Sequence, residues 1–264
     1  MSNTTAVAGD RMATVFRHAT VVTINDGREV LRDADLLVED DRISAIGHDL
    51  DVPAGTVEVD ASGGILMPGM IDTHRHMWQT VVRGRAANWT ISRYFAWCTR
   101  NQHAFRPDDV HAGNHLSALE AFEAGITTTV DWSHGLQTVE HANAAVDALE
   151  RSRGRFVLAY GNMFAPAVKW ATTEAFRDFV ERRLRSRDPI GLQLAIDVTG
   201  DPSFPEGPAF DVARELGVGV GVTSHTGILG RPARRGHPRI RQHRLVPEHR
   251  ARGLHRPALL RVLA

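Results

Sequence analysis

Two rhythms of apolar and polar residues follow one another along the chain, and the change falls near Gly63-Gly64. Up to that point, short β-branched runs are separated by turn residues such as Asn25-Asp26-Gly27. Runs of this kind are typical of strands joined by tight turns. We therefore expect a small antiparallel β unit between Thr14 and Asp60. Its strands are predicted at residues 19–24, 34–39, 42–47 and 56–59.

Beyond residue 64, apolar runs alternate with segments of helical pattern. The clearest helix begins at Pro107, which suits a first turn, and stops before Gly125. Alternation on this scale indicates βα units around a parallel sheet. Strands are predicted at 65–72, 126–132, 156–160, 190–197 and 218–223, and helices at 107–124, 139–151, 173–185 and 206–216.

Five strands of this type fit either an open doubly wound sheet or the first part of a (β/α)8 barrel. A dinucleotide-binding sheet carries a Gly-x-Gly-x-x-Gly turn after its first strand. No such turn follows residues 65–72. The sequence therefore weighs against a dinucleotide fold.

Composition places the chain among globular proteins. It has 264 residues, 42% of them hydrophobic and 23% charged, which are ordinary values for a folded domain. No apolar run approaches the ~20 residues of a membrane span, and the N-terminus lacks the pattern of a signal peptide. Cys98 is the only cysteine, so no internal disulfide can form. We take a cytoplasmic setting as the default.

The zero net charge hides an asymmetry between the body of the chain and its tail. Residues 231–264 contain ten arginines and a single acid, Glu248. The remaining 21 basic and 30 acidic residues give residues 1–230 a formal charge of −9. Such a tail could bind nucleic acid or a membrane surface, and its histidines could bind metal.

The residues with the most specific chemistry are His74 and His76, which end the first strand after residue 64. Alternate residues of a strand point to the same face, so both imidazoles can reach one ion. Imidazole suits Zn, Fe and similar metals. His225 ends the fifth strand, and strand C-termini meet at one face of a barrel. We predict that these three histidines converge.

The alternative is that these histidines only pack or face solvent, since the chain has 14 of them. A lone His-x-His is weak evidence. The pair here directly follows Met-Pro-Gly-Met-Ile-Asp-Thr, residues 67–73, which is far more specific. The helix histidines are expected to be solvated or packed: His103, His111, His115 and His141.

The segment Gly63–His76 closely resembles the first barrel strand of metal-dependent amidohydrolases. The branch it resembles contains cytosine deaminase, triazine chlorohydrolase and guanine deaminase-like enzymes. The resemblance covers roughly residues 14–230. It implies a partial (β/α)8 TIM barrel of about five βα units, preceded by half of a small β-sandwich.

The resemblance also implies a function. It implies a divalent metal, usually Zn or Fe, and hydrolysis of a C–N bond in a cyclic amidine, amide or aminated heterocycle. His74, His76 and His225 match the family's ligand positions on strands one and five. A bound ion would lower the pKa of water from ~15.7 toward ~7 and so make it a nucleophile. In the family, a strand-six histidine and a strand-eight aspartate move the proton to the leaving amine.

Two departures from the family pattern restrict the expected number of metal ions and the expected substrate class. Some relatives bridge two metals with a carboxylated lysine on strand four, but the only lysine here is Lys169, before that strand. A single metal ion is therefore expected. Many deaminases of this branch also place a glutamate three residues after the strand-five histidine, where this chain has Ile228. That difference puts purine or triazine deamination by such an acid in doubt.

Three further residues are candidates for substrate contacts. Gln79 matches a pocket position in some relatives, although it could equally be a solvated residue near a helix start. Trp78 and His134 lie just after strand ends and could line a pocket. For Trp78 and for Trp132, core packing is an equally good explanation.

The tail does not continue the barrel pattern. Four histidines recur every six residues between His237 and His255, a period that fits neither a helix face nor a strand. No counterpart of the strand-six histidine or the strand-eight aspartate is visible. We expect the tail to be a frameshift product: plausible codons for residues 249–254, read one base over, give Ile-Val-His-Val-Ala. Resequencing the gene would test this.

The sequence thus predicts four segments and three functions to compare. The segments are a leader (1–12), a β-sandwich portion (13–63), a truncated barrel (64–230) and the tail (231–264). The favoured function is a metal-dependent hydrolase of a small-molecule C–N substrate, with homo-oligomers in the intact family. The alternatives are an inactive fragment that binds metal weakly and, less favoured, a nucleic-acid-binding module.

Overall fold

A computed structural model describes residues 12–184, 190–198, 201–216, 221–225 and 261–263. These residues form two compact units, residues 12–70 with 261–263 and the described residues from 71 to 225. The predicted leader therefore lies outside the described residues except for its last residue, Met12. The predictions about residues 231–260 of the tail also lie outside them.

The first unit is a six-stranded sheet in the order β11-β5-β1-β2-β3, with β4 also paired to β1. Its strands are β1 (Ala13–Val22), β2 (Val30–Glu39), β3 (Arg42–Gly47), β4 (Val57–Asp60), β5 (Ile65–Met67) and β11 (Arg261–Leu263). The antiparallel prediction is confirmed for β1, β2 and β3. It is wrong for β4, which runs parallel to β1. The strand β5, which lies outside the predicted antiparallel unit, also runs parallel to β1.

The parallel pairing follows from the path of the chain after β3. Residues 48–56 carry the chain back to the far side of β1, so that β4 starts at the same end as β1. Residues Thr14–Arg17 of β1 then pair with β4, and Thr20 and Val21 pair with β5. Register shifts near Ala19 separate these two halves of β1.

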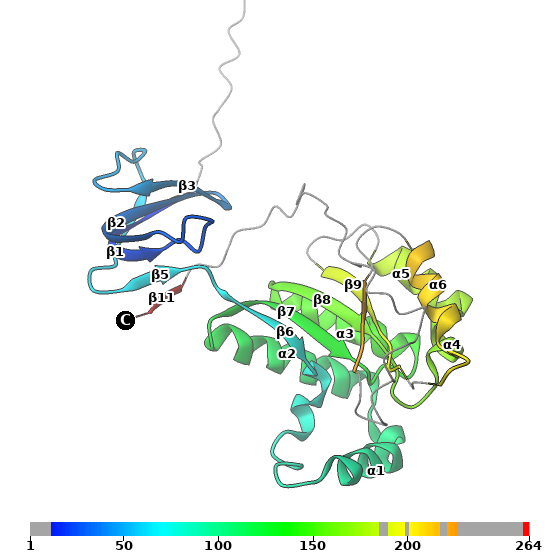
Figure 1. Cartoon of the computed structure of the whole chain (residues 1–264). Helices are drawn as coiled ribbons and strands as arrows, with labels where there is room; N and C mark the ends of the chain where they lie inside the picture. Colours follow the sequence, from blue (N-terminus) through cyan, green and yellow to red (C-terminus); the bar gives the residue numbers. More distant parts are fainter. Residues whose placement is uncertain (1–11, 185–189, 199–200, 217–220, 226–260, 264) are drawn as a thin grey trace, which may run out of the picture. The chain divides into compact units, whose positions relative to one another are not determined.

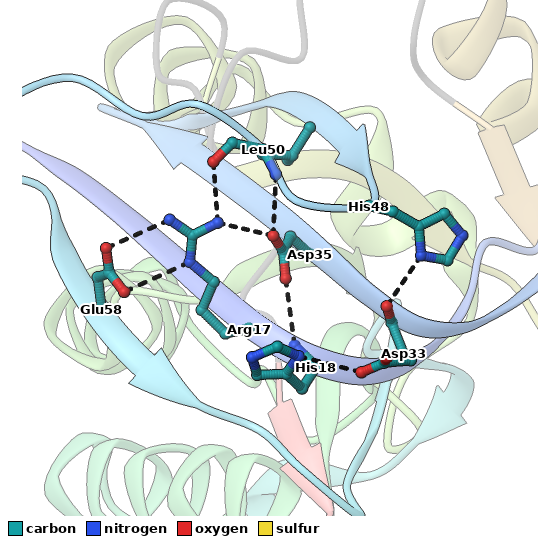
Figure 2. Close-up of polar contacts among 7 residues, drawn as sticks. All are labelled: Arg17, His18, Asp33, Asp35, His48, Leu50 and Glu58. Carbon is teal, nitrogen blue, oxygen red and sulfur yellow. Dashed lines mark hydrogen bonds and ion pairs between the residues drawn. The ribbon is translucent and has the colours of Figure 1, made fainter.

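Arg17 is the centre of a charged clamp that joins β1, β2, β4 and the 48–56 loop (Figure 2). Its guanidinium donates to Asp35 at 2.7 Å, to the Leu50 carbonyl at 2.9 Å and to Glu58 at 3.2 Å. Asp35 also accepts the backbone N–H groups of Leu50 and His18. Burial alone would raise the pKa of Asp35, but these hydrogen bonds outweigh it and lower that pKa.

The second unit is built on a five-stranded sheet in the order β10-β9-β8-β7-β6. The strands are β6 (Met70–Arg75), β7 (Ile126–Ser133), β8 (Arg155–Tyr160), β9 (Ile190–Ala195) and β10 (Gly221–Thr223). The strands β7 to β10 pair in parallel, each with the next in sequence. The predicted partial barrel of about five βα units is confirmed.

The strand predicted at residues 65–72 is wrong in one respect, because the structure divides it. Residues 65–67 form β5 in the first sheet, and β6 starts at Met70 in the second. Pro68 separates them. Proline has no N–H to donate to a strand ladder, so a break at this position is expected on chemical grounds.

The four predicted helices are present as α2 (Pro107–Glu123), α3 (Val139–Ser152), α5 (Glu174–Arg183) and α6 (Gly207–Glu215). Figure 1 shows α2 and α3 lying along the sheet of the second unit. The structure adds four short elements that the pattern did not indicate: η1 (Met77–Val82), α1 (Ile91–Asn101), η2 (Gln102–Ala104) and α4 (Ala167–Ala171). Among the described helices, none combines the length and apolar character needed to cross a membrane.

Candidate metal centre

The end of β6 presents two histidines from one rigid strand. Alternate residues of a strand share a face, which places His74 and His76 on the same side. His76 directly follows the strand and precedes η1, with φ −101° and ψ 78°. His225 arrives from the residues just after β10.

The three imidazoles form one cluster of ligand atoms. One ring nitrogen from each of His74, His76 and His225 lies within 4.8 Å of the others. The Nε2 atoms of His74 and His225 are 3.1 Å apart. Two nitrogens bound to one tetrahedral zinc at ~2.0–2.1 Å would be about 3.3 Å apart. The three nitrogens therefore have the spacing that one metal ion requires.

Hydrogen bonds fix which nitrogen of two rings is free to bind metal. His76 Nδ1 is 2.9 Å from the Trp132 carbonyl, which can only accept, so Nδ1 carries the proton. His225 Nδ1 likewise donates to Asp197 Oδ1 at 3.1 Å. Both rings therefore turn an unprotonated Nε2 toward the cluster. Partners of this kind orient the ligands of known metal sites.

Burial lowers the pKa of two histidines of the cluster. The pKa of His76 falls to about 4, mainly because the ring is buried, while the nearby His74 and His225 act in the same direction and the Trp132 carbonyl opposes them. The pKa of His74 is also lowered, by burial first and by His225 second. Metal binding requires unprotonated imidazole, and the lowered pKa of His74 and of His76 favours that form at neutral pH. The Trp132 ring stacks on His225 with centroids 3.8 Å apart.

A fully buried carboxylate lies directly behind the cluster. Asp131, at the end of β7, accepts the Met77 N–H at 3.1 Å and the Asn114 amide at 2.9 Å. Burial raises the pKa of Asp131 to about 7, although these two donors act in the opposite direction. Within the described part of the chain, Asp131 forms no ion pair.

The three predicted substrate contacts lie in different surroundings. His134 is buried beside His76, with ring centroids 4.3 Å apart, and burial holds its pKa well below the ordinary value. Trp78 is buried in the core, where its indole N–H points toward His134 Nδ1 at 3.4 Å. Gln79 donates to the Tyr94 hydroxyl. A direct substrate contact by any of them stays a prediction.

Trp78 fills its space closely. A Cβ added to Gly135 would approach the Trp78 ring to 2.7 Å, and one added to Gly113 would approach the Trp78 carbonyl to 2.6 Å. Only glycine fits at position 135 without displacing the Trp78 indole, and only glycine fits at position 113 without displacing the Trp78 backbone. The Trp78 ring is therefore fixed in its position next to His134.

A cavity of about 250 Å³ opens next to the cluster. His134 and Asp197, each in contact with a cluster histidine, form part of its wall. The rest of the lining is mainly apolar: Asn162, Met163, Phe164, Ala165, Pro166, Ala167, Trp170 and Ala195. A largely apolar hollow with a few polar groups at one end is typical of a small-molecule site.

The structure adds two features that the sequence reasoning missed. Asp197 orients His225, and its position two residues after β9 could have indicated this role, because strand C-termini converge in a barrel. The contact between Asn114 and Asp131 had no local signal. Of the helix histidines expected to pack, His141 is confirmed, since its ring bonds to Thr138 and to the Phe105 carbonyl.

Comparison with known proteins gives one family over most of the chain. Residues 65–229 match the amidohydrolase family. The 5'-deoxyadenosine deaminase of Methanosarcina acetivorans is 30% identical over 120 residues, which cover 44% of this chain and 27% of that protein. The 5-methylthioadenosine/S-adenosylhomocysteine deaminase of Bacillus cytotoxicus is 26% identical over 192 residues, which cover 70% and 43%.

Solved structures resemble the fold as well. A mutant atrazine chlorohydrolase from Arthrobacter aurescens, with zinc and atraton, has a TM-score of 0.68 at 19% identity and covers 81% of this chain. An adenosine deaminase from Xanthomonas campestris with bound zinc has a TM-score of 0.62 at 19% identity, again over 81% of this chain. The match spans 52% and 49% of those two chains. This chain thus spans about half the length of these relatives or less.

Proposed function

Because the chain belongs to the amidohydrolase family, we propose that it is a metal-dependent hydrolase of non-peptide C–N bonds in a small cyclic or amide substrate. The observation that supports this most strongly is the cluster of His74, His76 and His225 beside an apolar cavity. All three offer imidazole nitrogen, which suits Zn and Fe. We propose one divalent ion of either kind.

A single ion is favoured by the donor set. A second metal in this family would need a bridging carboxylated lysine on the fourth barrel strand, and β9 contains none. Lys169, the only lysine of the chain, belongs to α4. When bound, a divalent ion supplies Lewis acidity, which makes water nucleophilic at neutral pH.

The protein's own groups would hold and orient the reacting parts. Asp197 and the Trp132 carbonyl keep the protons of His225 and His76 on Nδ1, so each Nε2 stays available as a ligand. In the reaction, water oxygen bonds to the trigonal carbon, the C–N bond breaks, and the leaving nitrogen takes up a proton.

The cavity supports a flat, largely uncharged substrate. Met163, Phe164 and Trp170 offer apolar surface, and His134 beside them stays neutral. The aromatic rings of Phe164 and Trp170 can pack against planar heterocycles. The named relatives act on adenosine derivatives and a triazine. We propose an aminated heterocycle or a cyclic amide as the substrate class.

The alternative is a chain that binds metal without turning over substrate. Among the described strands, β10 pairs only with β9, which leaves its other edge open. An open edge favours association or insolubility. The family's strand-six histidine and strand-eight aspartate have no assigned counterpart in this chain. A cytoplasmic setting, a homo-oligomer and a nucleic-acid role of the tail stay predictions.

The test measures metal content and ammonia release on the purified chain. Bound zinc or iron is counted by mass spectrometry, and turnover is measured on a panel of aminated heterocycles and cyclic amides. We expect about one ion per chain, lost in His74→Ala and His76→Ala but retained in the control His103→Ala, an exposed histidine outside the cluster. Metal with turnover supports the hydrolase, whereas metal without turnover supports the alternative.

A further inference from the structure

Three consecutive residues, Arg75, His76 and Met77, form hydrogen bonds to neighbouring elements, the first two through their side chains and Met77 through its backbone N–H. Arg75 reaches Ser117 of α2, with its guanidinium 3.4 Å from the Ser117 carbonyl. His76 donates to the Trp132 carbonyl, and the Met77 N–H donates to Asp131. The last two contacts come from adjacent residues of β7. The Trp132 carbonyl holds the His76 side chain, and the Asp131 side chain holds the Met77 backbone.

This anchoring meets a specific need. His76 is neither strand nor helix, and the Met77 N–H at the start of η1 has no partner within its own helix. A buried N–H without a partner costs roughly 1–3 kcal/mol. The Asp131 carboxylate supplies that partner from another strand. The position of His76 therefore depends on β7 and not on β6 alone.

Asn114 in turn fixes the carboxylate. It lies in α2, fully buried, and its amide N–H donates to Asp131 Oδ2, while Asp131 Oδ1 faces Met77. The Oδ1 atom of Asn114 is buried without a hydrogen-bond partner in the described structure. An amide left half-satisfied to serve a carboxylate is unusual, because buried polar groups are generally paired.

We infer that Asn114 and Asp131 are positioning residues for the metal centre: they hold the Met77 backbone so that His76 turns Nε2 toward His74 and His225. Neither touches the ion or the substrate. The inference rests on the proposed function because it assumes a metal centre. The hydrogen bonds that it describes are present without metal or substrate. It predicts that the pair controls metal affinity more strongly than it controls folding.

The first experiment measures zinc affinity by competition with a coloured chelator, at a temperature where each variant is folded. We expect Asp131→Ala to weaken zinc binding by about 10–100-fold, the range found when groups that orient metal ligands are removed. The matched control is Thr129→Ala, a buried polar residue two positions earlier on β7. It should leave zinc affinity within about twofold of the wild type.

The decisive variant exchanges the two side chains, as Asn114→Asp with Asp131→Asn. The exchanged pair can still form the same hydrogen bonds: the new amide at 131 presents its oxygen to Met77 and donates to the new carboxylate at 114. We expect zinc affinity within about threefold of the wild type. A folded exchange variant that binds as weakly as Asp131→Ala overturns the inference. If Asp131→Ala does not fold, Asn114→Ala takes its place, with a smaller expected loss.

A second readout separates this inference from the proposed function. In metal-free protein, ¹⁵N NMR reports which nitrogen of His76 is protonated. We expect Nδ1 in the wild type and in the exchange variant, and a mixture of both forms in Asp131→Ala. If the wild type binds no zinc, the proposed function fails while this measurement still tests the positioning. An unchanged His76 signal in Asp131→Ala overturns the positioning role.

Discussion

Each of the two units buries one aspartate completely or nearly so, and the two carboxylates have opposite electrostatic surroundings. Asp35 is 3% exposed and Asp131 is 0% exposed. Asp35 has an arginine at 2.7 Å and a lowered pKa. Asp131 has only neutral donors, and its pKa is raised to about 7. Burial acts in the same direction on both, so the partner decides the result.

The contrast separates two uses of a buried acid. In the first unit, the clamp around Arg17 ties a loop and three strands together, and a charge pair serves that purpose (Figure 2). In the second unit, an arginine next to Asp131 would bring a positive charge close to three histidines that are proposed to bind a cation. Neutral donors hold the carboxylate there without opposing the metal.

The largest expected effect is the pH dependence that Asp131 causes. Its pKa is raised from 3.8 to about 7 in the folded chain, so the folded state binds the proton more tightly. Stability from this group is therefore full below pH ~4 and is lost as the pH rises to about 7. A tenfold change in proton affinity is worth about 1.4 kcal/mol, so the whole effect is roughly 4 kcal/mol.

Urea unfolding of metal-free wild type and Asp131→Asn between pH 4 and 8 measures this effect. The lowered pKa values of His74, His76 and His134 cause a loss of stability toward low pH, the opposite direction, so only the difference between the two proteins isolates Asp131. We expect the free energy of unfolding of Asp131→Asn to rise relative to that of the wild type as the pH rises. A constant difference across this range would mean that Asp131 is ionised throughout.

The next effect is the loss of the acid in the clamp. Asp35→Ala removes the acceptor for two backbone N–H groups and leaves Arg17 without its buried partner. Removing one partner of a buried ion pair costs about 3–5 kcal/mol. Because the Arg17 side chain is partly exposed, we expect the lower end, a loss of about 3 kcal/mol in the free energy of unfolding at pH 7. Zinc affinity of the folded variant should not change. A parallel fall in zinc affinity would end the distinction between the two acids.

The smallest effect concerns the outer member of the clamp. Glu58 binds Arg17 at 3.2 Å, but its side chain is 56% exposed. Exposed ion pairs contribute little because water and salt screen them. We expect Glu58→Gln to change the melting temperature by no more than the error of calorimetry. A large drop would show that the clamp needs both of its acids.

The sequence predicted the barrel and the three clustered histidines because their signals are local. His74 and His76 are two residues apart at a strand end, and His225 follows another strand, so strand geometry alone brings them to one edge. Pro68 is a local signal for the division between β5 and β6, although one continuous strand was predicted at residues 65–72. Asp131 could not be singled out, because its partner Asn114 lies 17 residues away on a helix. Only the packed structure shows that contact.

Trp132 gives the protein a built-in optical reporter. Its indole is buried and stacked on His225, while its carbonyl holds His76, so two proposed ligands meet at one chromophore. Indole emission responds to charge and to contacts within a few ångströms. Occupation of the centre therefore has a fluorescence signature that needs no added dye, and replacing Trp132 by phenylalanine assigns that signal among the five tryptophans of the chain.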